Sequence, residues 1–163
     1  MSATTIPINQ PTTAARVILW SGLIAGVLDL AGACLVAWIR GGVTPIRVFH
    51  SISSGIYGAA AFTGGVKMAA LGIVLHFIIA TTWAAAYYLA SRRIEFLISK
   101  PMVAGVLYGV VVYLFMNFII LPLSAVARRP VSLSSRAIGL LVIILCIGLP
   151  IAFIVRRFTD SNQ

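Results

Sequence analysis

Three polar side chains stand deep inside apolar runs of this sequence and could carry proton chemistry. Asp29 lies in "GLIAGVLDLAG", His76 in "LGIVLHFIIA" and Asn117 in "YLFMNFII". An acid and an imidazole that meet can share a proton, and an amide can both donate and accept hydrogen bonds beside them. Tyr108 is a fourth candidate. These residue types predict a buried polar cluster that binds a proton or relays it.

The elements that position this cluster are predicted to be membrane-spanning helices. Of the 163 residues, 61% are hydrophobic and 9% charged, and the mean hydropathy is +1.08. The apolar residues form four blocks, each close to the roughly 20 residues that cross a bilayer core as a helix. The sequence predicts an all-α membrane protein with four transmembrane helices. The expected spans are residues 17–38, 68–91, 102–123 and 137–155.

The depths of the three polar residues can be compared through the helical rise of about 1.5 Å per residue. Counted from the membrane face that holds the termini, Asp29 is about 18 Å deep, and His76 and Asn117 are each about 22 Å deep. All three are therefore expected near one plane. An isolated carboxylate is costly there, so we expect Asp29 to be protonated, hydrated or paired, with His76 as its natural partner.

Small residues at four-residue spacing predict which helix faces pack together. A groove of small residues lets a neighbouring backbone approach closely within a membrane. His76 continues such a row, followed by Ala80 and Ala84, so it is expected to face another helix and not lipid. The predicted packing glycines are Gly22, Gly26, Gly72, Gly105 and Gly109.

An internal repeat is one interpretation of two pairs of similar segments. "LIAGVLDL" (23–30) resembles "MVAGVLYG" (102–109), and "ALGIVL" (70–75) resembles "AIGLLV" (137–142). The first match places Tyr108 at the position of Asp29. Each half would be a two-helix hairpin, the two halves related by an axis along the membrane normal. Chance similarity between apolar segments is the alternative.

The first loop is predicted to contain a short amphipathic helix at residues 45–58. Thr44 followed by Pro45 is typical of a helix start. Ile46 and Ile56 share one face with two further apolar residues, so this helix is expected to lie in the membrane interface or dip into the bundle. His50 is expected to be exposed or to face the headgroups.

The segments outside and at the ends of the spans give the predicted domain organisation and orientation. Residues 1–16 are expected to form a disordered polar tail, 17–157 a single transmembrane domain and 158–163 a C-terminal tail. Trp and Tyr residues mostly fall near the span ends and are expected to be interfacial anchors; they are Trp20, Trp38, Trp83, Tyr87 and Tyr88. Lys and Arg number six on each side, so their distribution favours neither orientation. The lack of a signal peptide and the even number of spans favour cytoplasmic termini.

Several functional classes are disfavoured. The net charge of +9 comes from bases at the ends of apolar blocks, which is typical of contacts with lipid headgroups and not with nucleic acid. Cys34 and Cys146 have no partners at metal spacing and are expected to be packing residues. Axial haem ligation would need His50 and His76 at similar depths. His50 lies in the first loop and His76 near the middle of a span, so no cofactor or metal is expected. Motifs of hydrolytic and redox enzymes are absent, which predicts a non-enzymatic protein.

The first three spans and the first loop resemble a known family. The segments "GLIAGVLDL", "LGIVLHFIIATTWAAAYY" and "AGVLYGVVVYLFMNFIILPLS" are similar to those of the YagU-like family of uncharacterised bacterial four-helix inner-membrane proteins. The similarity covers about residues 21–124, and "SISSG…GAAAFTGG" is its most specific part, although the first loop is shorter here. It implies a bacterial inner-membrane location and supplies no catalytic residues.

Two functions remain open at this point. One is a structural or accessory membrane subunit in which the polar cluster fixes helix neighbours, with the lipid bilayer, further copies of the chain or other membrane subunits as partners. The other is a small proton-linked transporter or channel that uses Asp29 and His76.

Overall fold

The protein is a bundle of four membrane-spanning helices, as the sequence predicts. The computed structural model describes the backbone of residues 10–127 and 132–160, and the side chains of residues 14–127 and 132–159. Every regular element in these ranges is helical. The segments long and apolar enough to span a membrane are Ala14–Gly41, Gly65–Ser91, Pro101–Leu123 and Leu133–Thr159. The prediction of an all-α, multi-pass membrane protein is confirmed.

Two of the four spans are continuous α-helices and two are interrupted. The first span is α1 (Gln10–Gly41) and the second is α3 (Gly65–Ser91). The third is α5 (Pro101–Phe115), which continues through the π-helical segment η2 (Met116–Ile120) into α6 (Leu121–Leu123). The fourth is α7 (Leu133–Ile143), which continues through the π-helical segment η3 (Ile144–Gly148) into α8 (Leu149–Asp160).

The ends of the first and last spans differ from the sequence prediction. Helix α1 begins at Gln10, so residues 10–16 are helical and do not belong to a disordered tail; residues 1–9 lie outside the described part. The fourth span begins at Leu133, because the Ser132 side chain caps its first turn by accepting a hydrogen bond from the Ser135 N–H. It continues to Asp160, into the expected C-terminal tail, whose last residues 161–163 are not described.

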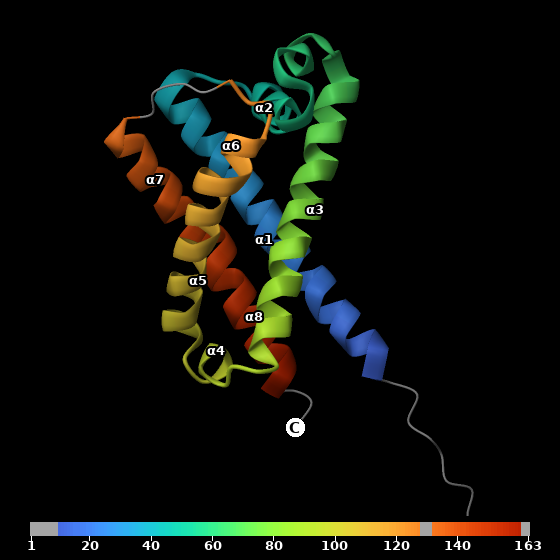
Figure 1. The fold of residues 1–163 in the computed structure, drawn as a ribbon, viewed down its shortest axis with the longest axis vertical. Helices are drawn as coiled ribbons and strands as arrows, with labels where there is room; N and C mark the ends of the chain where they lie inside the picture. Colours follow the sequence, from blue (N-terminus) through green and yellow to red (C-terminus); the bar gives the residue numbers. More distant parts are fainter. Residues whose placement is uncertain (1–9, 128–131, 161–163) are drawn as a thin grey trace, which may run out of the picture.

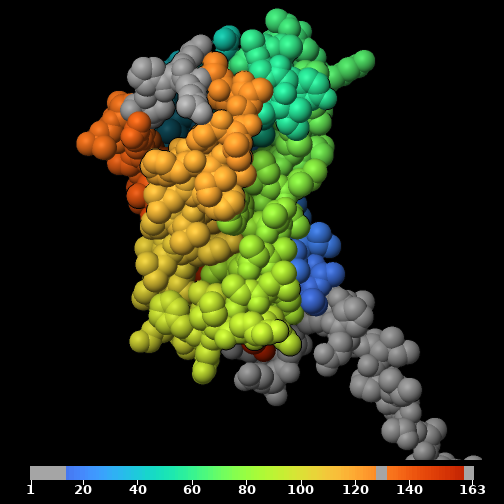
Figure 2. All heavy atoms as spheres, in the orientation of Figure 1, coloured from blue at the N-terminus to red at the C-terminus, as the bar shows by residue number. Residues whose placement is uncertain are grey.

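The short elements lie at opposite ends of the bundle (Figure 1). The start of α1, the end of α8 and the short helix α4 (Phe96–Ser99) lie together at one end, which we call the terminal end. Helix α2 (Pro45–Tyr57), the 3₁₀ segment η1 (Gly58–Thr63), α6 and the start of α7 lie at the other end, the loop end. In Figure 2, α3 and the α5–α6 helix cover the front face.

Glycines set the closest contacts between the spans. A Cβ at Gly22 would lie 2.7 Å from Thr81 Cα, and one at Gly26 would lie 2.9 Å from the Phe77 ring, so both glycines hold α1 against α3. Gly105 and Gly109 lie where α5 meets η3 and the start of α8, and Gly72 lies where α3 meets the backbone of α2. Each predicted packing glycine therefore lies at a contact between helices.

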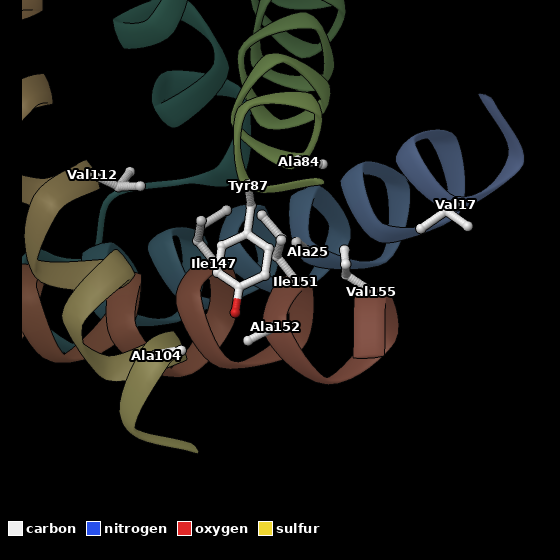
Figure 3. Close-up of a cluster of buried hydrophobic side chains, with 10 residues drawn as sticks. All are labelled: Val17, Ala25, Ala84, Tyr87, Ala104, Val112, Ile147, Ile151, Ala152 and Val155. Carbon is white, nitrogen blue, oxygen red and sulfur yellow. The ribbon is translucent and has the colours of Figure 1, made fainter. Parts of the chain in front are cut away.

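The tightly packed core lies toward the terminal end. Tyr87 of α3 is fully buried and points among side chains of α5, η3 and α8, as Figure 3 shows. Its hydroxyl donates a hydrogen bond to Leu97 O at 2.8 Å. The expectation that Tyr87 is an interfacial anchor is therefore wrong. The cluster comprises Val17, Ala25, Ala84, Tyr87, Ala104, Val112, Ile147, Ile151, Ala152 and Val155.

Helix α2 packs on the bundle through its small, polar face. Helix α2 begins at Pro45 as predicted, but Ile46 and Ile56 are exposed while Ser53 and His50 are buried. The expectation of an exposed His50 is wrong. Gly72 of α3 lets the α2 backbone approach closely, and the side of α2 that carries His50 is buried against the bundle. His50 Nε2 lies 2.9 Å from Gly65 O, and since a carbonyl only accepts, this nitrogen donates.

Candidate functional site

A cavity of about 450 Å³ lies in the loop half of the bundle, beside the packed core. On α3 the cavity residues run from Leu75 to Trp83, whereas the core begins at Ala84. On the fourth span the order is the same: Ile143 of α7 lines the cavity, Ile147 of η3 belongs to both cavity and core, and the core continues into α8. The bundle is therefore dense toward the terminal end and hollow in its loop half.

The cavity walls are mostly apolar and carry five polar side chains. A cavity of this size lies in the range of small-molecule sites, which combine apolar walls with a few polar groups. The polar side chains are Asp29, Ser51, His76, Asn117 and Ser124. Three of the four residues that the sequence singled out for proton chemistry therefore line one space.

Asp29 of α1 is the acidic side chain of the cavity. It is half-buried, and its carboxyl group makes no hydrogen bond in the described structure. Every buried side-chain oxygen or nitrogen of the described residues has a hydrogen-bond partner, so the carboxyl oxygens of Asp29 must reach accessible space. The cavity supplies that space, and the carboxyl group is available there to a proton or a ligand.

His76 of α3 lies near Asp29 but bonds elsewhere. Its Nε2 lies 2.9 Å from the backbone oxygen of Gly26, and because a carbonyl only accepts, Nε2 must carry a proton. Nδ1 is the ring nitrogen that remains for a second proton. The predicted direct bond between Asp29 and His76 is not formed among the described residues, since Gly26 has no side chain and lets the ring reach the α1 backbone. The two groups still interact electrostatically.

Asn117 lies on the π-helical segment η2 and faces the same cavity. Its side-chain N–H donates to Tyr113 O, one turn earlier, at 2.8 Å. Its amide oxygen makes no hydrogen bond in the described structure and can accept one from a ligand. A π-helix widens the turn and re-aims the side chains on it, and such segments are frequent at functional sites.

Both π-helical segments stand two residues before a proline and border the cavity. The sequences are "MNFIILP" before Pro122 and "ILCIGLP" before Pro150. A proline has no N–H for the carbonyl four residues before it and its ring crowds that carbonyl, so the preceding turn must open. The prolines thus explain where the third and fourth helices widen.

Tyr108, the fourth predicted site residue, does not line the cavity. Its hydroxyl donates to Trp83 O at 2.6 Å, and its ring contacts those of Trp83 and Tyr87 edge to face. Tyr108 therefore ties α5 to α3 behind the cavity wall. Trp83 itself lines the cavity, so its predicted role as an interfacial anchor is wrong. Trp83 lies seven residues after His76, on the same helix face, and this spacing was the signal that could have found it.

The loop end of the cavity is closed by α2 and the segment after α6. Ser51 and Gly55 of α2 line the cavity, and Ser124 and Val126 complete its edge. The Ala125 N–H donates to Gly55 O at 2.9 Å and joins the two segments. Sequence reasoning missed this contribution of α2, although Ser51 and Gly55 are four residues apart and therefore share one face of the helix.

The donor set of the cavity fits proton and ligand binding better than metal binding. Among the described side chains, those of residues 14–127 and 132–159, no three from His, Cys, Asp or Glu are grouped closely enough to hold a metal ion. Cys34 and Cys146 are free thiols, and Cys146 lies close enough to Asp29 for the two groups to interact electrostatically. The cavity can therefore bind a small molecule, and the Asp29 carboxyl group that lines it can take up or release a proton.

Comparison with known proteins gives no family for this chain. No protein-family model, no curated protein and no solved structure matches it, so the resemblance to YagU-like proteins stays a prediction.

Proposed function

We propose that this multi-pass membrane protein is a carrier for a small, mostly apolar solute, and that the protonation state of Asp29 is linked to solute binding. The observation that carries the proposal is the cavity within the bundle of spans, which Asp29 lines without a hydrogen-bond partner among the described residues. A carboxyl group held this way inside a membrane is costly and is typical of ion and substrate pathways.

The hydrogen bonds between helices support a carrier over a purely structural subunit. A polar cluster that only fixed helix neighbours would use its hydrogen-bonding groups on other helices. His76 and Tyr108 do this, through Gly26 O and Trp83 O. Asp29 and the Asn117 amide oxygen do not, and both belong to residues that line the cavity. The solute undergoes no chemical conversion in this proposal.

The proposed location is the bacterial inner membrane, with both termini on the cytoplasmic side. A helical bundle with long apolar spans suits that membrane, and Figure 1 places the start of α1 and the end of α8 at one end of the molecule. The loop end, with α2, would then face the opposite side. Reporter fusions at either terminus test this orientation.

The carrier proposal can be tested before any solute is known. In a background with both native cysteines changed to alanine, Ile79→Cys places a thiol in the cavity wall. Ile78→Cys is the matched control, because Ile78 is the adjacent isoleucine and is exposed on the outer surface of the bundle. Reaction with a small membrane-impermeant thiol reagent is followed in right-side-out and inside-out membrane vesicles.

A carrier must open its cavity to each side in turn, so Ile79→Cys should react in both kinds of vesicle and Ile78→Cys in neither. Reaction of Ile79→Cys from only one side would leave a binding protein and overturn the carrier. Equal, slow reaction of the two variants would mean that the cavity never opens to water, and the accessory-subunit function would then be favoured.

A further inference from the structure

We propose that the solute is a lipophilic monovalent cation, and that this cation and a proton bind to Asp29 in exclusion of one another. This inference rests on the proposed function and names the chemical class of its solute.

The charges of the cavity favour a cation. Asp29 is its acidic group, and no Lys or Arg of the described residues lines it. His76 bonds to Gly26 O through Nε2–H, which the neutral ring provides, so its place in the structure needs no positive charge. An anionic solute would meet an uncompensated carboxylate, and a neutral one would leave that carboxylate without a counter-charge. A cation satisfies it.

The walls favour a cation with an apolar body. Apart from the five polar side chains, the lining is aliphatic or aromatic and includes Trp83, Ile79, Met116 and Ile147. An indole ring can also attract an organic cation through its π-electrons. A strongly hydrated metal ion would gain little from such walls, whereas an organic ammonium ion with a hydrocarbon body would lose little hydration on entering.

The isolation of Asp29 explains why proton and cation would compete. A bare carboxylate inside a membrane is unfavourable, so its charge must be neutralised by whatever binds there. The titratable groups that face Asp29 are His76 from α3 and Cys146 from η3, and neither is a fixed positive charge. The elements α2 and α5–α6 contribute the uncharged Ser51 and Asn117. One site with two alternative occupants gives exchange of a cation for a proton.

Binding of two isosteric probes tests the solute class. Benzyltrimethylammonium carries a permanent charge, and neopentylbenzene has the same shape without it. Radiolabelled cation is bound to the purified protein in detergent and measured by equilibrium dialysis between pH 5 and pH 9. We expect saturable binding that weakens as the pH falls, approaching about tenfold per pH unit where one proton competes. Neopentylbenzene should not displace the cation at equal concentration.

Two variants separate the roles of the ionisable groups. Asp29→Asn should abolish cation binding and with it the pH dependence, while circular dichroism reports whether the variant is folded. Glu95→Gln removes an exposed carboxyl group that does not line the cavity and should retain both the binding and its pH dependence. Wild-type-like binding in folded Asp29→Asn, or loss of the pH dependence in Glu95→Gln, would overturn the proposal.

The outcomes are distinguishable from those of the carrier test. If Ile79→Cys reacts from both sides but wild-type protein does not bind benzyltrimethylammonium, the solute class is wrong and the carrier stands. If the cation binds with the expected pH dependence but Ile79→Cys reacts from one side alone, the site is assigned correctly and the carrier is wrong.

Discussion

Replacing Gly148 by alanine should destabilise the bundle although alanine is the better helix former. Gly148 ends η3 and faces α5 at two further glycines. A Cβ there would meet Gly105 O, and it would lie 2.8 Å from Gly109 N and 2.9 Å from Gly109 Cα. Each of these is a backbone atom, so no side chain can rotate away and the two helices must separate.

The size of the effect follows from these distances. Contacts of carbon with other heavy atoms are comfortable at about 3.5–4.0 Å, and the contact with Gly105 O is the shortest of the three, so α5 and η3 must move apart by roughly 1 Å. A gap of that size loses up to about half of each neighbouring contact. Overpacking of this kind costs about 1–3 kcal/mol. The higher helix propensity of alanine offsets about 1 kcal/mol. The net loss of unfolding free energy is about 0–2 kcal/mol.

Gly139→Ala is the matched control. Gly139 lies on α7 of the same span, and the nearest atom to a Cβ there is Cε2 of Tyr113, at an ordinary 3.6 Å. Its propensity gain of about 1 kcal/mol is therefore unopposed. Unfolding in mixed micelles of dodecyl maltoside and sodium dodecyl sulfate, followed by circular dichroism, should separate the two variants by about 1–3 kcal/mol. If Gly148→Ala is as stable as Gly139→Ala, the glycine contact does not govern this packing.

Two further predictions concern the core and the loop end. Tyr87→Phe should lower the free energy of unfolding by about 1 kcal/mol, because Leu97 O loses its donor; the same micelle titration should show little change for the adjacent Tyr88→Phe, and equal effects would contradict the assigned bond. Gly72→Ala should push α2 away from α3, because the new Cβ would meet the Phe49 backbone oxygen. The thiol of Ile79→Cys should then react faster from the loop side; an unchanged rate would show that α2 does not close the cavity.

The four spans and the helix faces that pack together could be predicted from the sequence. The length of an apolar block and the spacing of small residues are local properties, so they can be found without knowing which helices are neighbours. Gly22, Gly26, Gly72, Gly105 and Gly109 each lie at a helix contact, as their spacing indicates. The start of α2 at Pro45 and of α5 at Pro101 follows from proline at the first helical position.

The parts that escaped prediction depend on which neighbour a helix face meets. An apolar face usually turns inward in a soluble protein, but lipid accepts it on the outside, so the Ser and His side of α2 could pack on Gly72. Trp83 and Tyr87 are typical of an interface by type alone, yet Trp83 lines the cavity and Tyr87 is buried in the core. The prediction of a direct hydrogen bond between Asp29 and His76 was wrong for a similar reason, because the His76 imidazole donates to the backbone oxygen of Gly26 instead.

The layer around Tyr87 has a consequence for any transport cycle. With the hollow half already at the loop end, a route to the terminal end must pass between the side chains of Figure 3. Opening that route means separating the buried core side chains of the described residues, so it would be the slow conformational step. Substitutions that loosen this layer would raise the transport rate and lower the free energy of unfolding at the same time. Activity and stability would therefore oppose one another at the residues around Tyr87.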